Sequence, residues 1–112
     1  MKKVEAIIRP TKFEDLKRAL EAAGFHSMTV TEVKGRGRQK GIVQQWRGQE
    51  YRVDMISKIK VEIIVDDDRV ESLVSTIVDN TRTGNIGDGK IFIIPVDNVV
   101  RIRTGEKDGE AL

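Results

Sequence analysis

A glycine-rich stretch at residues 84–90 is the part of this sequence best suited to bind an anion. It reads GNIGDGK and fits the Gly-x4-Gly-Lys spacing of a P-loop, but Ile91 stands where a Ser or Thr would bind magnesium. The next residues, IFII, predict a strand, whereas a P-loop leads into a helix. Successive N–H groups of such a turn can still form an anion nest, to which Lys90 adds a positive charge. The stretch is therefore either a phosphate-binding loop or an ordinary turn between a helix and a strand.

Arg101 and Arg103 are the second candidate for anion binding. They lie two residues apart in a predicted strand over residues 99–103, so their side chains should share one face. Two neighbouring guanidinium groups repel unless an anion or carboxylates lie between them, and an arginine fork suits phosphate oxygens. A solvent-exposed edge strand is the alternative for this pair alone. Together with residues 84–90, the pair favours a polyphosphate site, over which residues 35–41 could close.

The long stretch between residues 35 and 58 is predicted to be a loop with a partner-binding role. It shows no secondary-structure period, contains four glycines before residue 55, and holds the only Trp and the only Tyr of the chain. Loops longer than about 12–15 residues are uncommon in compact domains and are usually functional or disordered. Residues 34–60 carry eight basic and two acidic side chains, although the whole chain has a net charge of only +2. A basic loop on an acidic body predicts an anionic ligand or partner.

Composition limits the remaining possibilities. A chain of 112 residues is expected to form one domain around one core. The absence of Cys excludes disulfides and thiolate metal sites, and the single His26 cannot form a histidine metal site by itself. No apolar run approaches the roughly 18 residues of a membrane span, and no signal-peptide pattern begins the chain, which predicts a cytoplasmic protein.

The elements that would position these residues follow from hydrophobic periodicity. Strands are expected at residues 3–8, 28–33, 59–65, 90–95 and 99–103, with a charged tail after them. A first helix is predicted from a capping box formed by Thr11 and Glu14 to a stop at Gly24, and a second helix begins at the acids 66–68. In the third strand, Ile59, Val61, Ile63 and Val65 should face the helices, while Lys58, Lys60, Glu62 and Ile64 face away.

An internal repeat supports the same architecture. Residues 3–8 (KVEAII) recur 57 positions later as KVEIIV, and the helix positions Leu16 and Leu20 superpose on Leu73 and Ile77. Two such halves predict an α+β, ferredoxin-like βαββαβ fold. We expect a single domain over residues 1–112, with a long flexible partner-binding loop at 36–57 between the second and third strands. A glycine-rich phosphate loop at 82–90, the short last strand at 99–103 and a C-terminal segment at 101–112 complete it.

The chain resembles the PII signal-transduction proteins of nitrogen metabolism over essentially its whole length. The matching segments are residues 28–35, 37–41, 47–48, 50–51, 83–84, 86–92 and 100–105. The resemblance implies a homotrimer of ferredoxin-like subunits that senses ATP, ADP and 2-oxoglutarate in clefts between subunits. In this family the long loop reports the bound ligands to target proteins, so no enzyme activity is expected.

The resemblance also implies roles for individual residues. The ATP or ADP site would comprise Thr29, Gly35, Gly37, Arg38, Glu62, Ile64, Gly87, Asp88, Gly89, Lys90, Arg101 and Arg103, with the last two reaching in from the neighbouring chain. The 2-oxoglutarate site would comprise Gln39, Lys40, Gly41 and Lys58, and Gln39 would also help to hold Mg²⁺.

Trp46 and Arg47 resemble the loop tip with which relatives contact an ammonium transporter, the leading expectation for a partner. Other enzymes of nitrogen metabolism are further candidates, and membrane association would occur only through a transporter. Tyr51 is a candidate for uridylylation, although Trp46 and Gln49 depart from the family's signature around it. An RNA-binding module of similar fold is the alternative function. It would stack bases on aromatic residues of the central strands, and the third strand offers none on its outward face, so no nucleic-acid partner is expected.

Overall fold

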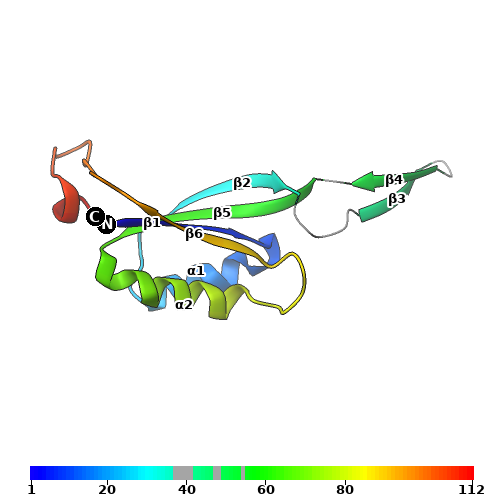
Figure 1. The fold of residues 1–112 in the computed structure, drawn as a ribbon, viewed down its shortest axis with the longest axis horizontal. Coiled ribbons are helices and arrows are strands. Elements are labelled where there is room, and N and C mark those ends of the chain that lie inside the picture. Colours follow the sequence, from blue (N-terminus) through cyan, green and yellow to red (C-terminus); the bar gives the residue numbers. More distant parts are fainter. Residues whose placement is uncertain (37–41, 47–48, 54) are drawn as a thin grey trace.

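The computed structural model describes residues 1–36, 42–46, 49–53 and 55–112, the two short central ranges by their backbone. Its strands and α-helices follow one another in the order β1-α1-β2-β3-β4-β5-α2-β6 (Figure 1). Their bounds are β1 Lys2–Ile8, α1 Phe13–Ala22, β2 Thr29–Gly35, β3 Ile42–Trp46, β4 Gln49–Val53, β5 Ile56–Val65, α2 Val70–Thr81 and β6 Gly89–Pro95. Without β3 and β4 this is the predicted βαββαβ arrangement, so the ferredoxin-like α+β fold is confirmed.

Four strands form one antiparallel sheet in the order β2-β5-β1-β6. Both helices cover the same face of this sheet, as Figure 1 shows. β1 lies in the interior of the sheet, where Ala6 pairs with Val61 on one side and with Ile91 on the other. This register places the end of β1 beside the beginning of β6 and near the beginning of β5. Residues that follow β1 and residues that precede β6 therefore lie close together at that end of the sheet.

The core fills the space between the helices and the sheet. It consists of Val4, Ala6, Ile8, Leu16, Leu20, Phe25, Val61, Ile63, Val65, Leu73 and Ile77, all of them buried. The alternation predicted for β5 is confirmed, because Val61, Ile63 and Val65 are buried while Ile64 is exposed. Burying one such aliphatic side chain stabilises the fold by roughly 1.5–3 kcal/mol.

The predicted capping box at Thr11 is wrong. A 3-10 helix at Pro10–Lys12 precedes α1, whose first residue is Phe13, and no side chain caps either start. Pro10 accounts for this, because its fixed φ favours a tight first turn, closed by the Lys12 N–H donating to the Arg9 carbonyl at 3.0 Å. Gly24 ends the helix as predicted, with φ at +87°.

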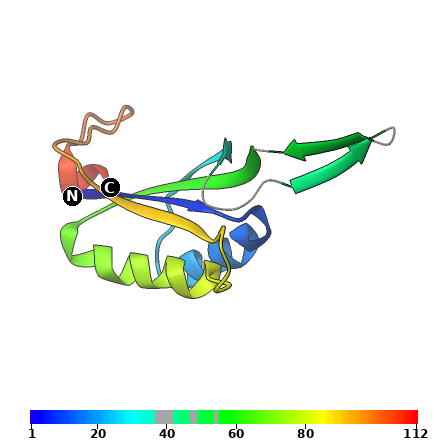
Figure 2. The same ribbon diagram turned by 45° about the vertical axis from the view of Figure 1, so that its right-hand side comes forward.

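Residues 42–46 and 49–53 also differ from the prediction of an irregular loop. β3 and β4 pair as an antiparallel hairpin from Ile42 opposite Val53 to Trp46 opposite Gln49. The hairpin projects away from the four-stranded sheet in both ribbon views (Figures 1 and 2). Two residues with glycine second separate two runs rich in β-branched and aromatic residues, a hairpin signal that the glycine count obscured.

The predicted last strand over residues 99–103 is replaced by a turn. Its only strand-like pairing among the described residues is an isolated bridge between Val100 and Lys107. The Arg101 N–H donates to the Glu106 carbonyl at 2.9 Å, and Val99 exchanges two hydrogen bonds with Asp108. A 3-10 helix at Asp108–Ala111 follows. No helix in the described ranges is long and apolar enough to cross a membrane.

Candidate functional site

The glycine-rich loop lies at the end of the sheet from which the hairpin projects (Figures 1 and 2). There it borders an open cavity of about 440 Å³ that has both apolar and basic walls. The lining residues are Ile7, Gly35, Arg36, Ile56, Lys58, Phe92 and residues 85–90. The structure thus brings six of the predicted site residues together: Gly35, Lys58, Gly87, Asp88, Gly89 and Lys90.

Backbone conformation explains why glycine is needed in this loop. Gly87 and Gly89 have φ values of +103° and +104°, in the left-handed region that favours glycine. A Cβ atom at Gly89 would lie 1.7 Å from the backbone oxygen of Ile7. The loop therefore enters β6 in direct backbone contact with β1, and no larger residue fits at Gly89.

Asp88 is occupied by hydrogen bonds from its own loop. Its carboxylate accepts from the Thr83 N–H at 2.8 Å, from the Gly84 N–H at 2.9 Å and from the Thr83 hydroxyl. These bonds, the Thr83 hydroxyl foremost, hold the pKa of Asp88 well below its ordinary value. Asp88 thus fixes the loop as a closed turn, whatever else binds there.

Lys58 connects β5 to the same loop. Its ammonium group donates to the Gly87 carbonyl at 2.6 Å. Burial lowers the pKa of Lys58, the neighbouring Arg9 charge lowers it further, and Asp88 partly offsets the change. A cation at this position can meet an anionic ligand that enters the cavity.

Arg9 was missed by the sequence analysis. It follows β1 directly, and its guanidinium group donates to the Asp88 carboxylate at 3.1 Å and to the Ile86 carbonyl at 2.8 Å. The available signal was topological, because in a ferredoxin-like sheet the first and last strands are neighbours. The end of the first strand must then lie beside the start of the last one.

Three other predicted site residues lie further along β2 and β5, away from the glycine-rich loop. Thr29 pairs with Glu62 in the register of β2 and β5, and Ile64 is two residues further along β5. The Glu62 carboxylate lies 3.2 Å from the Lys3 ammonium and 3.7 Å from that of Lys60. The structure does not bring these residues to the glycine-rich loop within one chain.

Arg101 and Arg103 are also remote from the glycine-rich loop, in the segment after β6 near both termini (Figure 1). The expectation that they share a strand face is wrong, because they lie in a turn. Arg103 is exposed, whereas Arg101 donates to the Glu106 carboxylate and to the Ala111 and Leu112 carbonyls, each at 3.4 Å. Within one chain they cannot complete a site at the loop.

Several predicted residues cannot be placed. Gly37, Arg38, Gln39, Lys40, Gly41 and Arg47 lie outside the described residues. Trp46 and Tyr51 belong to β3 and β4, which are described by their backbone.

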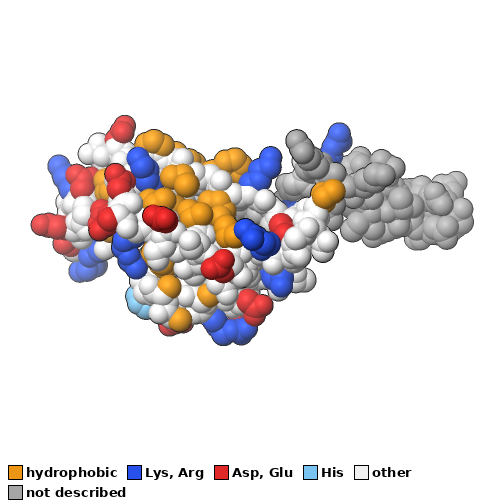
Figure 3. All heavy atoms as spheres, turned by 60° about the horizontal axis from the view of Figure 1, so that its bottom comes forward, with side chains coloured by type: hydrophobic (Ala, Val, Ile, Leu, Met, Phe, Trp, Pro, Cys, Tyr) orange, Lys and Arg blue, Asp and Glu red, His pale blue; other side chains and the backbone are white. Residues whose placement is uncertain are grey.

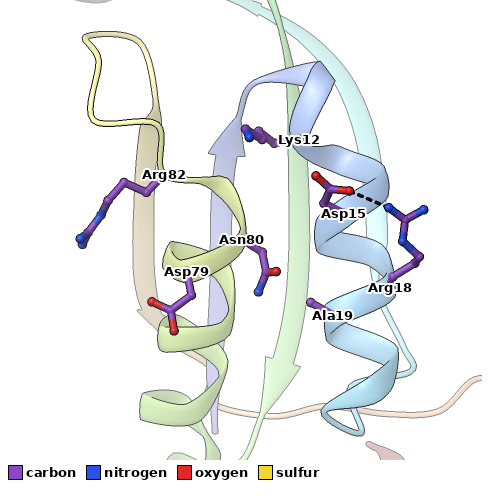
Figure 4. A pocket seen from close by; sticks show the side chains of 7 residues that line it. All are labelled: Lys12, Asp15, Arg18, Ala19, Asp79, Asn80 and Arg82. Atoms are coloured by element: carbon purple, nitrogen blue, oxygen red, sulfur yellow. Dashed lines mark hydrogen bonds and ion pairs between the residues drawn. The ribbon is translucent and has the colours of Figure 1, made fainter.

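A second groove, of about 490 Å³, lies on the helix side, between α1 and the end of α2 (Figure 4). Its cations do not converge on a common point. Arg18 is paired with Asp15 at 2.6 Å, and Arg82 points away from the gap between the helices in Figure 4. This groove lacks the arrangement of an anion site.

The outward faces of the central strands also bear on the RNA alternative. β1 and β5 are fully described and contain no aromatic residue. Their outward positions instead carry the ion pairs that Glu62 makes with Lys3 and Lys60. The stacking platform of an RNA-recognition module is therefore absent from these two strands.

Comparison with known proteins shows the family of this chain. The chain matches the family model described as "Nitrogen regulatory protein P-II" over residues 1–106. It is 60% identical over 112 residues to Nitrogen regulatory protein P-II 2 of Methanothermobacter thermautotrophicus, covering 100% of this chain and 97% of the relative. It is also 60% identical to Nitrogen regulatory protein P-II of Synechocystis sp. and 59% identical to that of Nostoc punctiforme, each with 100% of both chains covered. The chain therefore belongs to the P-II family of nitrogen regulatory proteins.

Proposed function

We propose that this protein signals nitrogen, carbon and energy status by binding ATP or ADP together with 2-oxoglutarate. The observation that carries the proposal is the cavity at the base of the hairpin, where the glycine-rich loop meets Lys58 and Lys90. Left-handed glycines beside a cationic side chain support a phosphate site here. The hairpin projects from the same end of the sheet, so it could signal to a target whether that site is occupied. The protein acts by binding and not by catalysis.

The binding site is completed by a second copy of the chain. One subunit offers the glycine-rich loop at one end of the sheet and the segment with Arg101 and Arg103 at the other. Thr29, Glu62 and Ile64 lie between these ends, along β2 and β5. Exposed apolar residues support such contacts: Phe92, Ile93 and Ile94 of β6 are 45%, 50% and 37% exposed. Apolar side chains also gather along the middle of the face seen in Figure 3. A homotrimer would bring the two ends together in each cleft.

2-Oxoglutarate would bind between Lys58 and residues 39–41, with the Lys58 ammonium pairing with a carboxylate. Mg²⁺ prefers oxygen ligands and commonly takes few from the protein, so the amide oxygen of Gln39 is a suitable donor. When bound, Mg²⁺ would neutralise part of the phosphate charge. With Gln39 as the donor, the site would not need the Ser or Thr that binds Mg²⁺ in a P-loop, where this chain has Ile91.

The hairpin is the surface that would contact a target. Trp46 pairs with Gln49 in the last pair of the hairpin, and Arg47 follows Trp46 in the sequence. An ammonium transporter is the proposed partner, and other nitrogen-metabolism enzymes are further targets. The protein would be cytoplasmic and reach the membrane only through a transporter. Tyr51, in β4, is the proposed position for uridylylation.

Calorimetry with ATP, ADP and 2-oxoglutarate tests the proposal. Lys90→Ala, Arg101→Ala and Arg103→Ala should each weaken ATP binding about tenfold to a hundredfold, as expected for a lost charged hydrogen bond. Lys12→Ala removes a cation from the helix-side groove and is the matched control. Lys58→Met should abolish 2-oxoglutarate binding and weaken ADP binding by a much smaller factor, because Lys58 reaches the phosphate site only through the Gly87 carbonyl. Unchanged ATP affinity in the three site variants, all folded and trimeric, would overturn the phosphate assignment.

A further inference from the structure

Arg9 is bonded to two separate points of the glycine-rich loop. Its Nε donates to Asp88 Oδ1 at 3.1 Å and its Nη2 donates to the Ile86 carbonyl at 2.8 Å. The side chains of Arg9 and Asp88 are 23% and 24% exposed, so the pair is largely shielded from water. A planar guanidinium that bridges two acceptors fixes their relative positions, which a lysine ammonium at the same place would not do.

Asp88 extends this arrangement across the loop. The same carboxylate that accepts from Arg9 also accepts from the N–H groups of Thr83 and Gly84. Its hydrogen bonds therefore connect the end of β1, the beginning of the loop and the residue just before β6. The negative charge of Asp88 is directed at these donors, and its depressed pKa agrees with that engagement.

The two cations also determine the orientation of the peptide planes at the tip of the loop. Arg9 binds the Ile86 carbonyl, and Lys58 binds the Gly87 carbonyl at 2.6 Å. In a trans peptide the N–H points opposite to the C=O, so the N–H groups of Gly87 and Asp88 point away from the cations that bind their peptides. Neither of these N–H groups donates a hydrogen bond to any other residue that the structure describes. They remain available to an anion.

We infer that Arg9 is a positioning residue, which through the Ile86 carbonyl and the Asp88 carboxylate presets the glycine-rich loop to receive phosphate. The inference rests on the proposed nucleotide site and adds to it a residue that does not touch the ligand. Preorganised N–H donors bind an anion more tightly because the loop loses less freedom on binding. Since Asp88 already neutralises Arg9, the contribution of Arg9 is one of shape and not of net charge.

The sign of one variant's effect separates these two roles. Asp88→Asn removes a negative charge beside the phosphate site and leaves Arg9 without its counterion. If charge alone mattered, Asp88→Asn would bind ATP more tightly than the parent. If the loop is held by the Arg9–Asp88 pair, the same variant should bind ATP about tenfold more weakly, as expected for the loss of a charged hydrogen bond.

Substitutions of Arg9 complete the test by calorimetry with ATP. Arg9→Met should weaken ATP binding about tenfold. Arg9→Lys should weaken it to a similar degree, because lysine keeps the charge but not the two-point contact. Arg18→Met is the matched control, since Arg18 pairs with Asp15 at 2.6 Å on α1 and should leave affinity unchanged. Parental affinity in Arg9→Lys, or tighter binding by Asp88→Asn, would overturn the inference.

NMR relaxation without nucleotide tests the positioning role of Arg9 separately from ATP affinity. Backbone ¹⁵N heteronuclear NOEs of Gly87 and Asp88 should be as high in the parent as those of neighbouring β6 residues. They should fall in Arg9→Met and Asp88→Asn while those of β6 do not change. A parent that binds no nucleotide overturns the proposed function, and NOEs that are the same in all variants overturn the positioning role of Arg9.

Discussion

The two halves of the repeat share a scaffold but differ after their helices. The 3-10 helices Pro10–Lys12 and Asp67–Arg69 begin 57 positions apart, and so do α1 and α2. The repeat superposes buried Val4, Ala6 and Ile8 on buried Val61, Ile63 and Val65, and Leu16 and Leu20 on Leu73 and Ile77. The common part of the two halves is therefore the part that builds the core.

The difference lies in the connection to the following strand. In the first half, Phe25 is 3% exposed, and the Arg69 guanidinium lies 4.2 Å from the centre of its ring. The equivalent position in the second half is Arg82, which is exposed and begins the glycine-rich loop. One connection was used to close the core and the other to build a polar site. At this pair of equivalent positions, Phe25 therefore contributes to the core, whereas Arg82 lies on the surface at the start of the proposed binding loop.

The largest expected effect comes from Gly89→Ala. The new Cβ would lie 1.7 Å from the Ile7 oxygen, so β1 and β6 would have to separate locally. We expect a loss of unfolding free energy above about 4 kcal/mol, in the range that single substitutions rarely reach. Gly24→Ala, whose Cβ would lie 3.5 Å from the nearest atom, is the control from the first half. It should cost about 1 kcal/mol for its left-handed φ. Urea denaturation measures both, and equal losses would contradict the close approach of β6 to β1 at Gly89.

Phe25→Ala and Arg82→Ala test the contrast at equivalent positions. Removing the buried ring should cost about 3–5 kcal/mol, whereas removing the exposed Arg82 side chain should change stability by less than about 0.5 kcal/mol. Denaturant midpoints give the comparison directly. A large loss in Arg82→Ala would mean that the Arg82 side chain, although exposed, also stabilises the fold.

Leu16→Ala and Leu73→Ala examine what the halves share. Both side chains are 0% exposed, so each deletion should cost about 2–5 kcal/mol. We expect the two losses to agree within about 1 kcal/mol, as measured by denaturation under the same conditions. A clear inequality would show that one half contributes more of the core than its equivalent positions indicate.

The smallest effect concerns pH and Asp88. Because the folded state lowers the pKa of this carboxyl, its ionised form stabilises the fold above the unfolded value of about 4. That stability is lost as the pH falls through the lowered folded pKa. The melting temperature of Asp88→Asn should therefore lie below that of the parent at neutral pH, and the difference should shrink below pH 4 or so. A difference that persists at low pH would assign the effect to packing.

The scaffold was more predictable from the sequence than the ends of its elements. Hydrophobic alternation at Val61, Ile63 and Val65 is a strong local signal, so the strand and its buried face followed from it. The apolar residues Val99, Val100 and Ile102 also predicted a strand, and that prediction was wrong. There the fold depends on the polar partners Glu106 and Asp108, whose hydrogen bonds close a turn instead.

The site was predictable only in part, for a related reason. The glycines and Lys90 are adjacent in sequence, so their chemistry was visible before the fold was known. Arg9 contacts Asp88 from 79 positions away, and no local pattern marks it. The glycine-rich loop precedes β6 and Arg101 follows it, so β6 itself separates the two and places the C-terminal turn at the other end of the sheet.

The strand order has a consequence for how the chain becomes a folded protein during synthesis. β5 separates β1 from β2, and β1 separates β5 from β6. Neither half of the repeat therefore contains two strands that pair with each other. When the first half leaves the ribosome, Val4, Ala6 and Ile8 have no neighbouring strand until β5 emerges, and such long-range pairing is slow. The two halves look like separate units in the sequence, yet each can only fold around the other.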